Sequence, residues 1–185
     1  DCWIKPLWAP RFAEVIQQLA VQLKVQILMI SHHEESLLSC IPHRLRIEKN
    51  ADGLSAQWSP TSDVPVWRDD EEGIRSITLE DFQSHTFTHL SLSPGLTLLS
   101  GDNDIGKSSV VAALRGLFLN ESNDTFIQHG KKSAKVTIDF GPQHLLTWER
   151  FLKGKVKESL RHFRAEDGPD RALHASDGAK SLPDW

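Results

Sequence analysis

The stretch Gly101-Asp102-Asn103-Asp104-Ile105-Gly106-Lys107-Ser108 decides the fold, because it fits the pattern GxxxxGK[ST]. The five residues before it, 96–100, form a short apolar run that is typical of a buried strand. Residues 107–119, which follow, carry apolar side chains at helical spacing. The stripe predicted to be buried consists of Val110, Val111, Leu114, Leu117 and Phe118. The sequence therefore predicts a strand, a glycine loop and a helix in the order that a phosphate-binding loop requires.

Each part of this loop suits the binding of a nucleoside triphosphate. Glycines let the backbone curl so that successive N–H groups face phosphate oxygens, and the start of the helix adds its positive end. Lys107 can reach the β- and γ-phosphates, and the hydroxyl of Ser108 can ligate Mg²⁺. We therefore expect a nucleotide and Mg²⁺ at this loop. The candidate cofactor-binding residues of the loop are Gly101, Asn103, Asp104, Ile105, Gly106, Lys107, Ser108 and Ser109.

The sequence before the loop predicts a helix and several strands. Residues 10–24 read as an amphipathic helix, whose apolar side is predicted to consist of Phe12, Val15, Ile16, Leu19 and Leu23. Residues 25–30 after it form an apolar run expected for a strand covered on both faces. A short helix to about residue 40 follows, and then two strands. These strands are expected at residues 43–48 and 54–58. Residues 59–73 contain prolines and an acidic run without periodicity, so we interpret them as a linker or long loop.

The remainder of the chain predicts mainly β-structure. Strands are expected at residues 74–82 and 86–92 before the loop, and at residues 135–140, 144–151 and 155–164 after it. Residues 165–185 are polar and weakly patterned. The predicted class is α/β, with a mixed sheet and an antiparallel β-subdomain.

Composition excludes several classes of protein. No apolar run reaches the roughly 18–20 residues that a membrane span needs, so we expect no membrane partner. Cys2 and Cys40 are too few for a disulfide scaffold, which favours reduced thiols and a cytoplasmic location. Because the chain begins at Asp1 and its one methionine is Met29, we expect a fragment of a longer protein.

Charge is distributed unevenly along the chain. The net charge is −4, but residues 128–164 hold nine Lys or Arg against three Asp or Glu. That stretch therefore carries +6 and the remainder −10. A basic stretch is usually a solvated face, although this one keeps contact with DNA possible.

The residues around the loop resemble the heads of SMC, RecF and SbcC-type ABC ATPases, particularly phage-type heads. The resemblance covers residues 77–88, the Pro94-Gly95-Leu96 turn and the loop itself, whose Asn103 and paired Ser108-Ser109 a generic P-loop lacks. Residues 126–130 and 148–150 continue it. The resemblance implies that Gln83, Ser84 and His85 lie near the nucleotide base or ribose. The alternative for these three residues is an ordinary turn at the end of a strand.

The first fifty residues resemble the other end of such a head. Residues 26–32 look like the strand and histidine loop that close an ABC core, which implies that His32 contacts the γ-phosphate and senses hydrolysis. His32 is therefore the candidate catalytic residue. Its neighbour His33 is not assigned a role. A surface turn is the alternative for this pair, which is too isolated to indicate a metal site.

The chain departs from the family pattern in two respects. In SMC-type proteins the P-loop half comes first and a long coiled coil follows it, whereas here the order is reversed. We expect a segment like the C-terminal lobe at residues 1–58, a linker at 59–73, and a segment like the N-terminal lobe at 74–185. In addition, the signature motif, the Asp-Glu pair that ends the Walker B strand, and a convincing Q-loop glutamine are not visible. The chain is thus expected to be a partial head.

The resemblance implies an ATP-hydrolysing head that acts in DNA repair, recombination or end processing. Its expected partners are a second head, most simply another copy of the chain, and DNA. A nuclease subunit similar to SbcD is a further expected partner. The alternative function is a nucleotide-gated binding module without useful hydrolysis. A small P-loop kinase or GTPase is a more distant alternative, because the chain has no Asn-Lys-x-Asp guanine motif.

Overall fold

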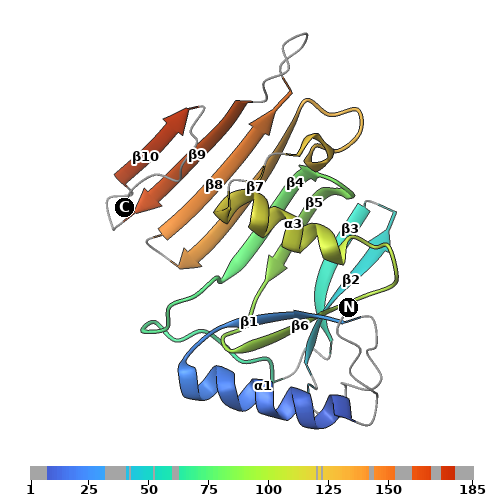
Figure 1. Cartoon of the computed structure of the whole chain (residues 1–185), viewed down its shortest axis with the longest axis vertical. Helices are drawn as coiled ribbons and strands as arrows, with labels where there is room; N and C mark the ends of the chain where they lie inside the picture. The colour runs from blue at the N-terminus through green and yellow to red at the C-terminus, as the bar shows by residue number, and fades with distance from the viewer. Residues whose placement is uncertain are drawn as a thin grey trace.

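The computed structural model describes residues 8–31, 41, 43–51, 53–59, 63–119, 121, 123–141, 144–152, 160–167 and 172–177. These residues form two β-sheets and two helices longer than one turn, together with a short 3₁₀ helix η2 (Asp124–Phe126) (Figure 1). No helix among the described residues is long and apolar enough to cross a membrane.

The first sheet is mixed and has the strand order β1-β6-β2-β3. Its strands are β1 (Ile27–Ile30), β2 (Arg44–Asn50), β3 (Gly53–Ser59) and β6 (Leu96–Ser100). β6 is parallel to both β1 and β2, and β2 is antiparallel to β3. A strand from the second half of the chain thus lies between two strands from the first half. β6 is buried at four of its five positions, which agrees with its apolar sequence.

The second sheet is antiparallel and has the strand order β10-β9-β8-β7-β4-β5. Its strands are β4 (Ser76–Phe82), β5 (His85–Ser91), β7 (Ser133–Gly141), β8 (His144–Phe151), β9 (Leu160–Asp167) and β10 (Ala172–Asp177). Buried and half-buried positions alternate along β7, as expected for a strand with one face on the core. The chain is therefore a mixed α/β protein with one mixed and one antiparallel sheet.

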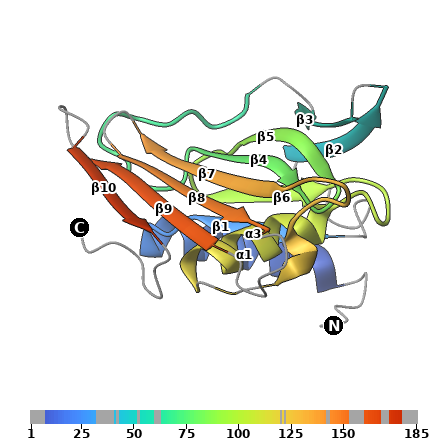
Figure 2. The same cartoon turned by 90° about the horizontal axis from the view of Figure 1, so that it is seen from above.

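The two helices cover different surfaces of the sheets. α1 (Ala9–Leu23) lies below the mixed sheet in Figure 1, and α3 (Lys107–Phe118) crosses in front of the antiparallel sheet. Figure 2 shows the strands of the antiparallel sheet on one side and α3 on the other. The main core lies between α3 and the two sheets, where Phe82, Phe126 and Trp148 pack with ring centroids 5.2–6.4 Å apart.

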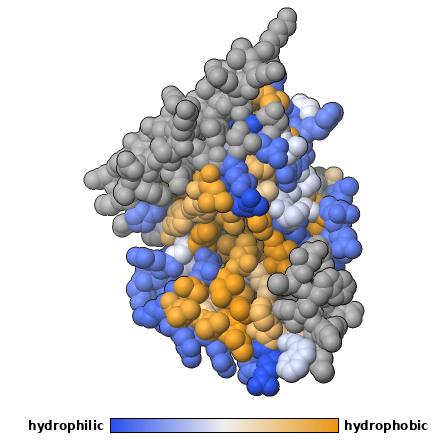
Figure 3. Space-filling view, viewed as in Figure 1, coloured by the Kyte–Doolittle hydropathy of each residue, from blue (hydrophilic) through white to orange (hydrophobic). Residues whose placement is uncertain are grey.

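Alanines, not the large apolar residues, form the buried face of α1. Ala9, Ala13 and Ala20 are at most 5% exposed, because small side chains let the helix approach the sheet closely. The predicted apolar residues Phe12 and Leu19 are each 39% exposed. Figure 3 shows hydrophobic residues gathered over the lower half of this face of the molecule, where α1 lies.

Gln26 lies between α1 and β1, and its side chain connects this part of the chain to residues near β4 and β6. Its side-chain Nε2 donates to the carbonyls of Ile74 at 2.9 Å and Ser93 at 3.1 Å, and its Oε1 accepts from the Ile74 N–H at 2.9 Å. Within the segment predicted as a linker, Trp67 donates from its indole Nε1 to the Leu92 carbonyl at 2.7 Å. Residues 63–73 contain no helix or strand, but these bonds hold the segment against the fold.

Three sequence predictions need correction. The last predicted strand, 155–164, is observed as β9 (Leu160–Asp167), and the weakly patterned tail contains β10. In α3 the predicted apolar residues Val111 and Phe118 are 41% and 38% exposed. Val110 and Leu117 of the predicted stripe are buried, and Ala113 lies beside them on the buried face of α3. Gly116 belongs to this face because Phe126 lies 3.0 Å from the place of an added Cβ.

Candidate phosphate-binding site

The phosphate-binding loop, residues 101–108, connects β6 to α3. Glycines in positive-φ conformations occupy its first residue and the residue directly before α3. Gly101 has φ +140° and Gly106 has φ +99°. A Cβ at Gly101 would lie 2.5 Å from the carbonyl oxygen of Ile47 on β2. A Cβ at Gly106 would lie 2.5 Å from the hydroxyl of Ser84. Both positions therefore require glycine, for conformational and for steric reasons.

α3 begins directly after Gly106, and no side chain caps its first turn. The first N–H groups of a helix have no partner inside the helix, and the helix dipole places positive charge beside them. This arrangement favours an anion at the start of α3.

The side chain of Lys107 folds back over the loop. Its Nζ donates to the carbonyl oxygens of Gly101 and Asp102, both at 2.6 Å, and the residue is 3% exposed. The ammonium group is thus fixed at the mouth of the loop. Asn103 and Asp104 are exposed on the loop, and Asp104 adopts φ +59°. The side chain of Ile105 is anchored against the main core.

Ser108 and Ser109 have different environments. Ser109 is 5% exposed, and its N–H donates to the Gly106 carbonyl at 3.0 Å, so its role is in the start of the helix. Ser108 is exposed and lines a hollow of about 510 Å³. The remaining lining residues of the hollow are Ile30, Gln83, Val111, Ala112, Arg115, Glu121, Asn123 and Phe126. This exposure leaves the Ser108 hydroxyl accessible to a metal ion.

The three residues of the β4–β5 turn that were assigned to the nucleotide have separate positions. Gln83 lines the hollow beside Ser108 and adopts φ +50°. Ser84 is exposed, and its hydroxyl lies against Gly106. His85 is fully buried, and its Nε2 lies 3.0 Å from the Gly106 carbonyl oxygen. Ser84 and His85 therefore contact the loop at Gly106, and His85 does so through the Gly106 carbonyl oxygen.

The pKa of His85 is lowered mainly because burial disfavours the charged imidazolium, while the hydrogen bond to Gly106 acts in the opposite direction. In the neutral ring one nitrogen donates and the other accepts. A carbonyl oxygen only accepts hydrogen bonds, so Nε2 carries the proton of the neutral ring and donates a hydrogen bond to the Gly106 carbonyl.

The strand before His32 ends beside the loop. Ile30 of β1 pairs with Leu99 of β6, and the Ser31 N–H donates to the Leu99 carbonyl at 3.3 Å. Because β1 and β6 are parallel, the segments that follow these two strands leave the sheet at the same edge. His32 and His33 lie outside the described residues, as does the short helix predicted up to Cys40.

Sequence reasoning did not identify Arg115 and Glu121 at the hollow. Arg115 contacts one carboxylate oxygen of Glu121 through Nε at 3.1 Å and Nη2 at 2.5 Å. Arg115 follows Ser108 by seven residues, so helical spacing places both side chains on the same face of α3. That spacing could have identified Arg115 from the sequence. Glu121 follows the end of α3, so helical spacing could not have placed it. In the part of the chain that the structure describes, no group of three or more His, Cys, Asp or Glu side chains could hold a metal ion.

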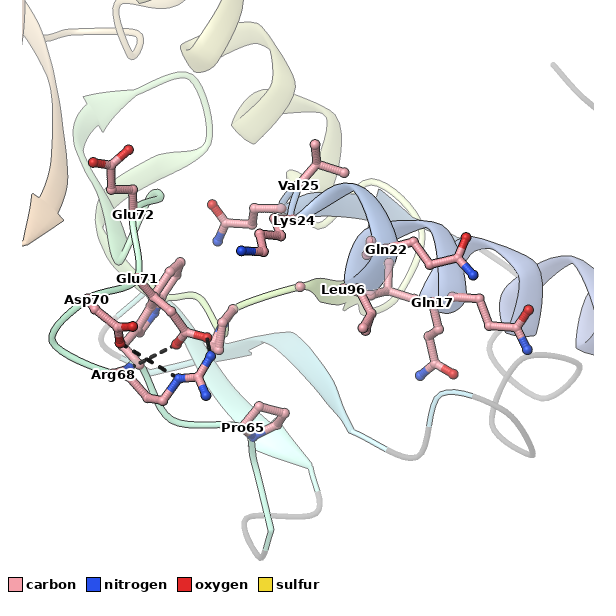
Figure 4. A pocket seen from close by; sticks show the side chains of 17 residues that line it. Gln17, Gln22, Lys24, Val25, Pro65, Arg68, Asp70, Glu71, Glu72 and Leu96 are labelled. Atoms are coloured by element: carbon pink, nitrogen blue, oxygen red, sulfur yellow. Dashed lines mark hydrogen bonds and ion pairs between the residues drawn. The ribbon is translucent and has the colours of Figure 1, made fainter.

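A larger hollow, of about 1120 Å³, lies at the other end of β6 (Figure 4). It is lined by Leu96, the first residue of β6, together with the end of α1 and the acidic segment near Glu71. The phosphate-binding loop follows the last residue of β6, and five strand residues span roughly 13 Å between their first and last Cα atoms. Arg68 pairs there with Glu71 at 2.9 Å. This hollow is therefore separate from the phosphate-binding loop.

Part of the basic stretch is neutralised by β4. Lys131 pairs with Asp81 at 2.9 Å, and Lys135 pairs with Glu80 at 2.8 Å. The three lysines at 153, 155 and 157 lie outside the described residues.

A strand, a glycine loop, an uncapped helix start and a lysine over the loop together define a P-loop nucleotide-binding domain. Residues 73–167 match the family described as AAA ATPase domain. This match covers 95 of the 185 residues, and the chain belongs to that family. Membership of an ATPase family implies that the domain binds ATP.

Known DNA-repair proteins show partial similarity to the chain. The DNA repair protein RecN of Xylella fastidiosa is 28% identical over 108 residues, which cover 55% of this chain and 19% of RecN. The DNA double-strand break repair Rad50 ATPase of Methanococcus maripaludis is 34% identical over 86 residues, 42% of this chain and 9% of Rad50. The DNA replication and repair protein RecF of Stenotrophomonas maltophilia is 27% identical over 105 residues, 54% of this chain and 29% of RecF.

The chain thus spans less than a third of the length of each of these three relatives. It is a partial ATPase domain related to SMC-like DNA-repair ATPases.

Proposed function

We propose that the chain is part of the ATP-binding head of an SMC/SbcC-type ATPase of the ABC class, which acts in DNA repair, recombination or end processing. The observation that carries this proposal is the loop between β6 and α3, where Lys107 is fixed by two loop carbonyls and two positive-φ glycines flank the bend. The similarity to RecN, Rad50 and RecF supports the DNA-repair setting.

In this proposal the loop binds the phosphates and the exposed Ser108 holds Mg²⁺ together with phosphate oxygens. Mg²⁺ commonly takes one or two protein ligands and completes its shell with phosphates and water. Gln83 lies beside the same hollow and is available to the bound nucleotide. His32 would contact the γ-phosphate. The parallel pairing of Ile30 with Leu99 supports this role, because the residues after β1 start at the edge where the loop starts.

The segments 1–58 and 74–185 then correspond to the two lobes of one head in reversed order. Support comes from the mixed sheet, in which β6 lies between β1 and β2. A second head, most simply another copy, would complete the nucleotide site. DNA and a nuclease subunit similar to SbcD are the further proposed partners, and Rad50 similarity is the basis for both.

A nucleotide-gated binding module without useful hydrolysis is the second candidate function. Glu121 lines the hollow beside Ser108, and Arg115 donates two hydrogen bonds to one of its carboxylate oxygens. A carboxylate engaged in this way is poorly placed to activate water. Steady-state phosphate release, measured with and without duplex DNA, separates a motor from a binding module.

The test of nucleotide binding is Lys107→Ala, measured by titration with a fluorescent ATP analogue. We expect affinity to fall by roughly tenfold to a hundredfold, since hydrogen bonds to charged groups contribute about 1.5–3 kcal/mol. Lys49→Ala, which removes an exposed lysine at the end of β2, is the control and should bind normally. Equal affinity of Lys107→Ala and the parent protein would refute the phosphate-binding assignment.

A further inference from the structure

We propose that His85 is a positioning residue for nucleotide binding, because its Nε2–H holds the peptide plane between Gly106 and Lys107 in the orientation that binds phosphate. The inference rests on the proposed function and extends it to a residue outside the loop. His85 is fully buried, and its Nε2 lies 3.0 Å from the Gly106 carbonyl oxygen.

The hydrogen bond acts on a backbone group that is central to the loop. In a trans peptide the C=O and the following N–H point in opposite directions. When His85 holds the Gly106 carbonyl toward the β4–β5 turn, the N–H of Lys107 points away from that turn, to the side where an anion would lie. The Ser109 N–H donates to the same carbonyl at 3.0 Å, so the plane is fixed from two directions.

The loop needs this support because Gly106 is flexible on its own. Glycine populates positive and negative φ about equally, and Gly106 must keep φ +99°. A glycine without a fixed carbonyl could rotate its peptide plane and remove the Lys107 N–H from the phosphate. The packing of Ser84 and His85 within 2.6 Å of the position of an added Cβ shows how closely the turn approaches Gly106.

A chain of contacts holds the imidazole ring itself. Its Nδ1 lies 2.9 Å from the hydroxyl of Thr88, and that hydroxyl lies 3.2 Å from the Leu54 carbonyl on β3. With Nε2 as the donor to Gly106, a neutral ring accepts at Nδ1. The Thr88 hydroxyl has a single proton, so it stabilises this tautomer by donating to Nδ1 in place of the Leu54 carbonyl. The side chains of Thr88 and His85, both on β5, thus lie between Leu54 on β3 and the loop.

Two amide substitutions separate positioning from packing. The amide nitrogen of glutamine can occupy the place of the His85 Nε2 and donate to Gly106. That of asparagine reaches only as far as Nδ1, next to Thr88. We expect His85→Gln to bind a fluorescent ADP analogue within about threefold of the parent protein. His85→Asn and His85→Ala should bind roughly tenfold to a hundredfold more weakly.

Thermal unfolding without nucleotide is measured for every variant, since a merely structural histidine affects only that readout. Equal ADP affinity for the Gln and Asn variants would overturn the inference. Thr88→Val forms an independent arm that leaves the ring in place, and we expect a smaller loss of affinity, of about three- to tenfold. If neither amide variant folds, unchanged affinity of Thr88→Val overturns the inference and weakened affinity supports it.

The parent protein distinguishes this inference from the proposed function. A parent protein without affinity for ADP or ATP refutes the proposed function, and the inference with it. A parent protein that binds normally, together with equal Gln and Asn variants, refutes the role of His85 alone.

Discussion

Ile30, the last residue of β1, lies opposite Leu99, the second-last residue of β6, in a parallel register. The loop that follows β6 begins with Gly101 and binds phosphate in our proposal. On β1 the chain continues through Ser31 to His32. Two segments about seventy residues apart in sequence therefore leave the sheet at one edge, and the contact that we propose between His32 and the γ-phosphate depends on this geometry.

The first prediction concerns His32. His32→Ala should leave ATP affinity within about threefold of the parent value, because the loop and Lys107 supply most of the contacts with phosphate. ATP-dependent dimerisation or turnover should fall by roughly tenfold or more, since one contact with the γ-phosphate is lost. Sedimentation with ATP and with ADP, combined with phosphate release, measures both. His33→Ala is the control, and equal effects of the two substitutions would contradict the role of His32.

Gly106→Ala should abolish nucleotide binding and destabilise the fold. Alanine at φ +99° costs about 1–2 kcal/mol, and its Cβ would also meet the Ser84 hydroxyl at 2.5 Å and the His85 Nε2 at 2.6 Å. Gly95→Ala is the matched control, because Gly95 also has positive φ, +73°, but no atom lies within 4 Å of an added Cβ.

Chemical denaturation should give a larger loss for Gly106→Ala than for Gly95→Ala, by about 1–3 kcal/mol. Equal losses would mean that the turn yields to the new methyl group and that close packing does not constrain the loop.

The strand, loop and helix around Lys107 could be predicted from sequence because their signals are local. β6 (Leu96–Ser100) is confirmed at the predicted boundaries, and α3 begins at the predicted Lys107. The same holds for β8 (His144–Phe151), along which buried and less buried positions alternate. A glycine loop with fixed spacing determines its own backbone, so few distant contacts are needed to identify it.

Contacts between distant segments could not be predicted in this way. The bonds of Gln26 to Ile74 and Ser93 join residues 48 and 67 positions apart, and a single glutamine gives no pattern. The role of His85 at Gly106 depends likewise on how the β4–β5 turn meets the loop. The buried face of α1 was predicted wrongly for another reason. It consists of alanines, which are less hydrophobic than Phe12 and Leu19, and the sequence pattern therefore pointed to these two exposed residues.

The stability of the protein should depend on pH through His85. Burial lowers its pKa below the ordinary 6.5, so below that pH the unfolded chain binds more protons than the folded one. Stability that is fully present above pH 6.5 is therefore lost as the pH falls toward the folded-state pKa. The parent protein should lose up to about 1.4 kcal/mol per pH unit in this window relative to His85→Gln.

Urea denaturation at several pH values between about 8 and 5 measures this difference, with about 6.5 as the reference point. His89→Gln, on the exposed side of the same strand, corrects for the loss of an imidazole that is not buried. A difference between the parent protein and His85→Gln that stays constant over the whole range would show that His85 does not titrate between the folded and unfolded states.

DNA binding, if the basic stretch provides it, should depend less on Lys131 and Lys135 than on the other lysines of the stretch. Lys131 and Lys135 are paired with Asp81 and Glu80, so moving them to a DNA phosphate first breaks an ion pair. We therefore expect a triple alanine substitution at Lys153, Lys155 and Lys157 to weaken binding of duplex DNA more than a Lys131→Ala/Lys135→Ala variant does.

Phosphate contacts release counterions, so affinity should fall steeply with salt and show little preference for sequence. Each lysine lost from a true contact lowers the slope of log affinity against log salt by about one. Titrations of labelled duplex DNA at several salt concentrations give this slope, and an unchanged slope in the triple variant would identify the basic stretch as a solvated surface that balances the acidic residues 69–72.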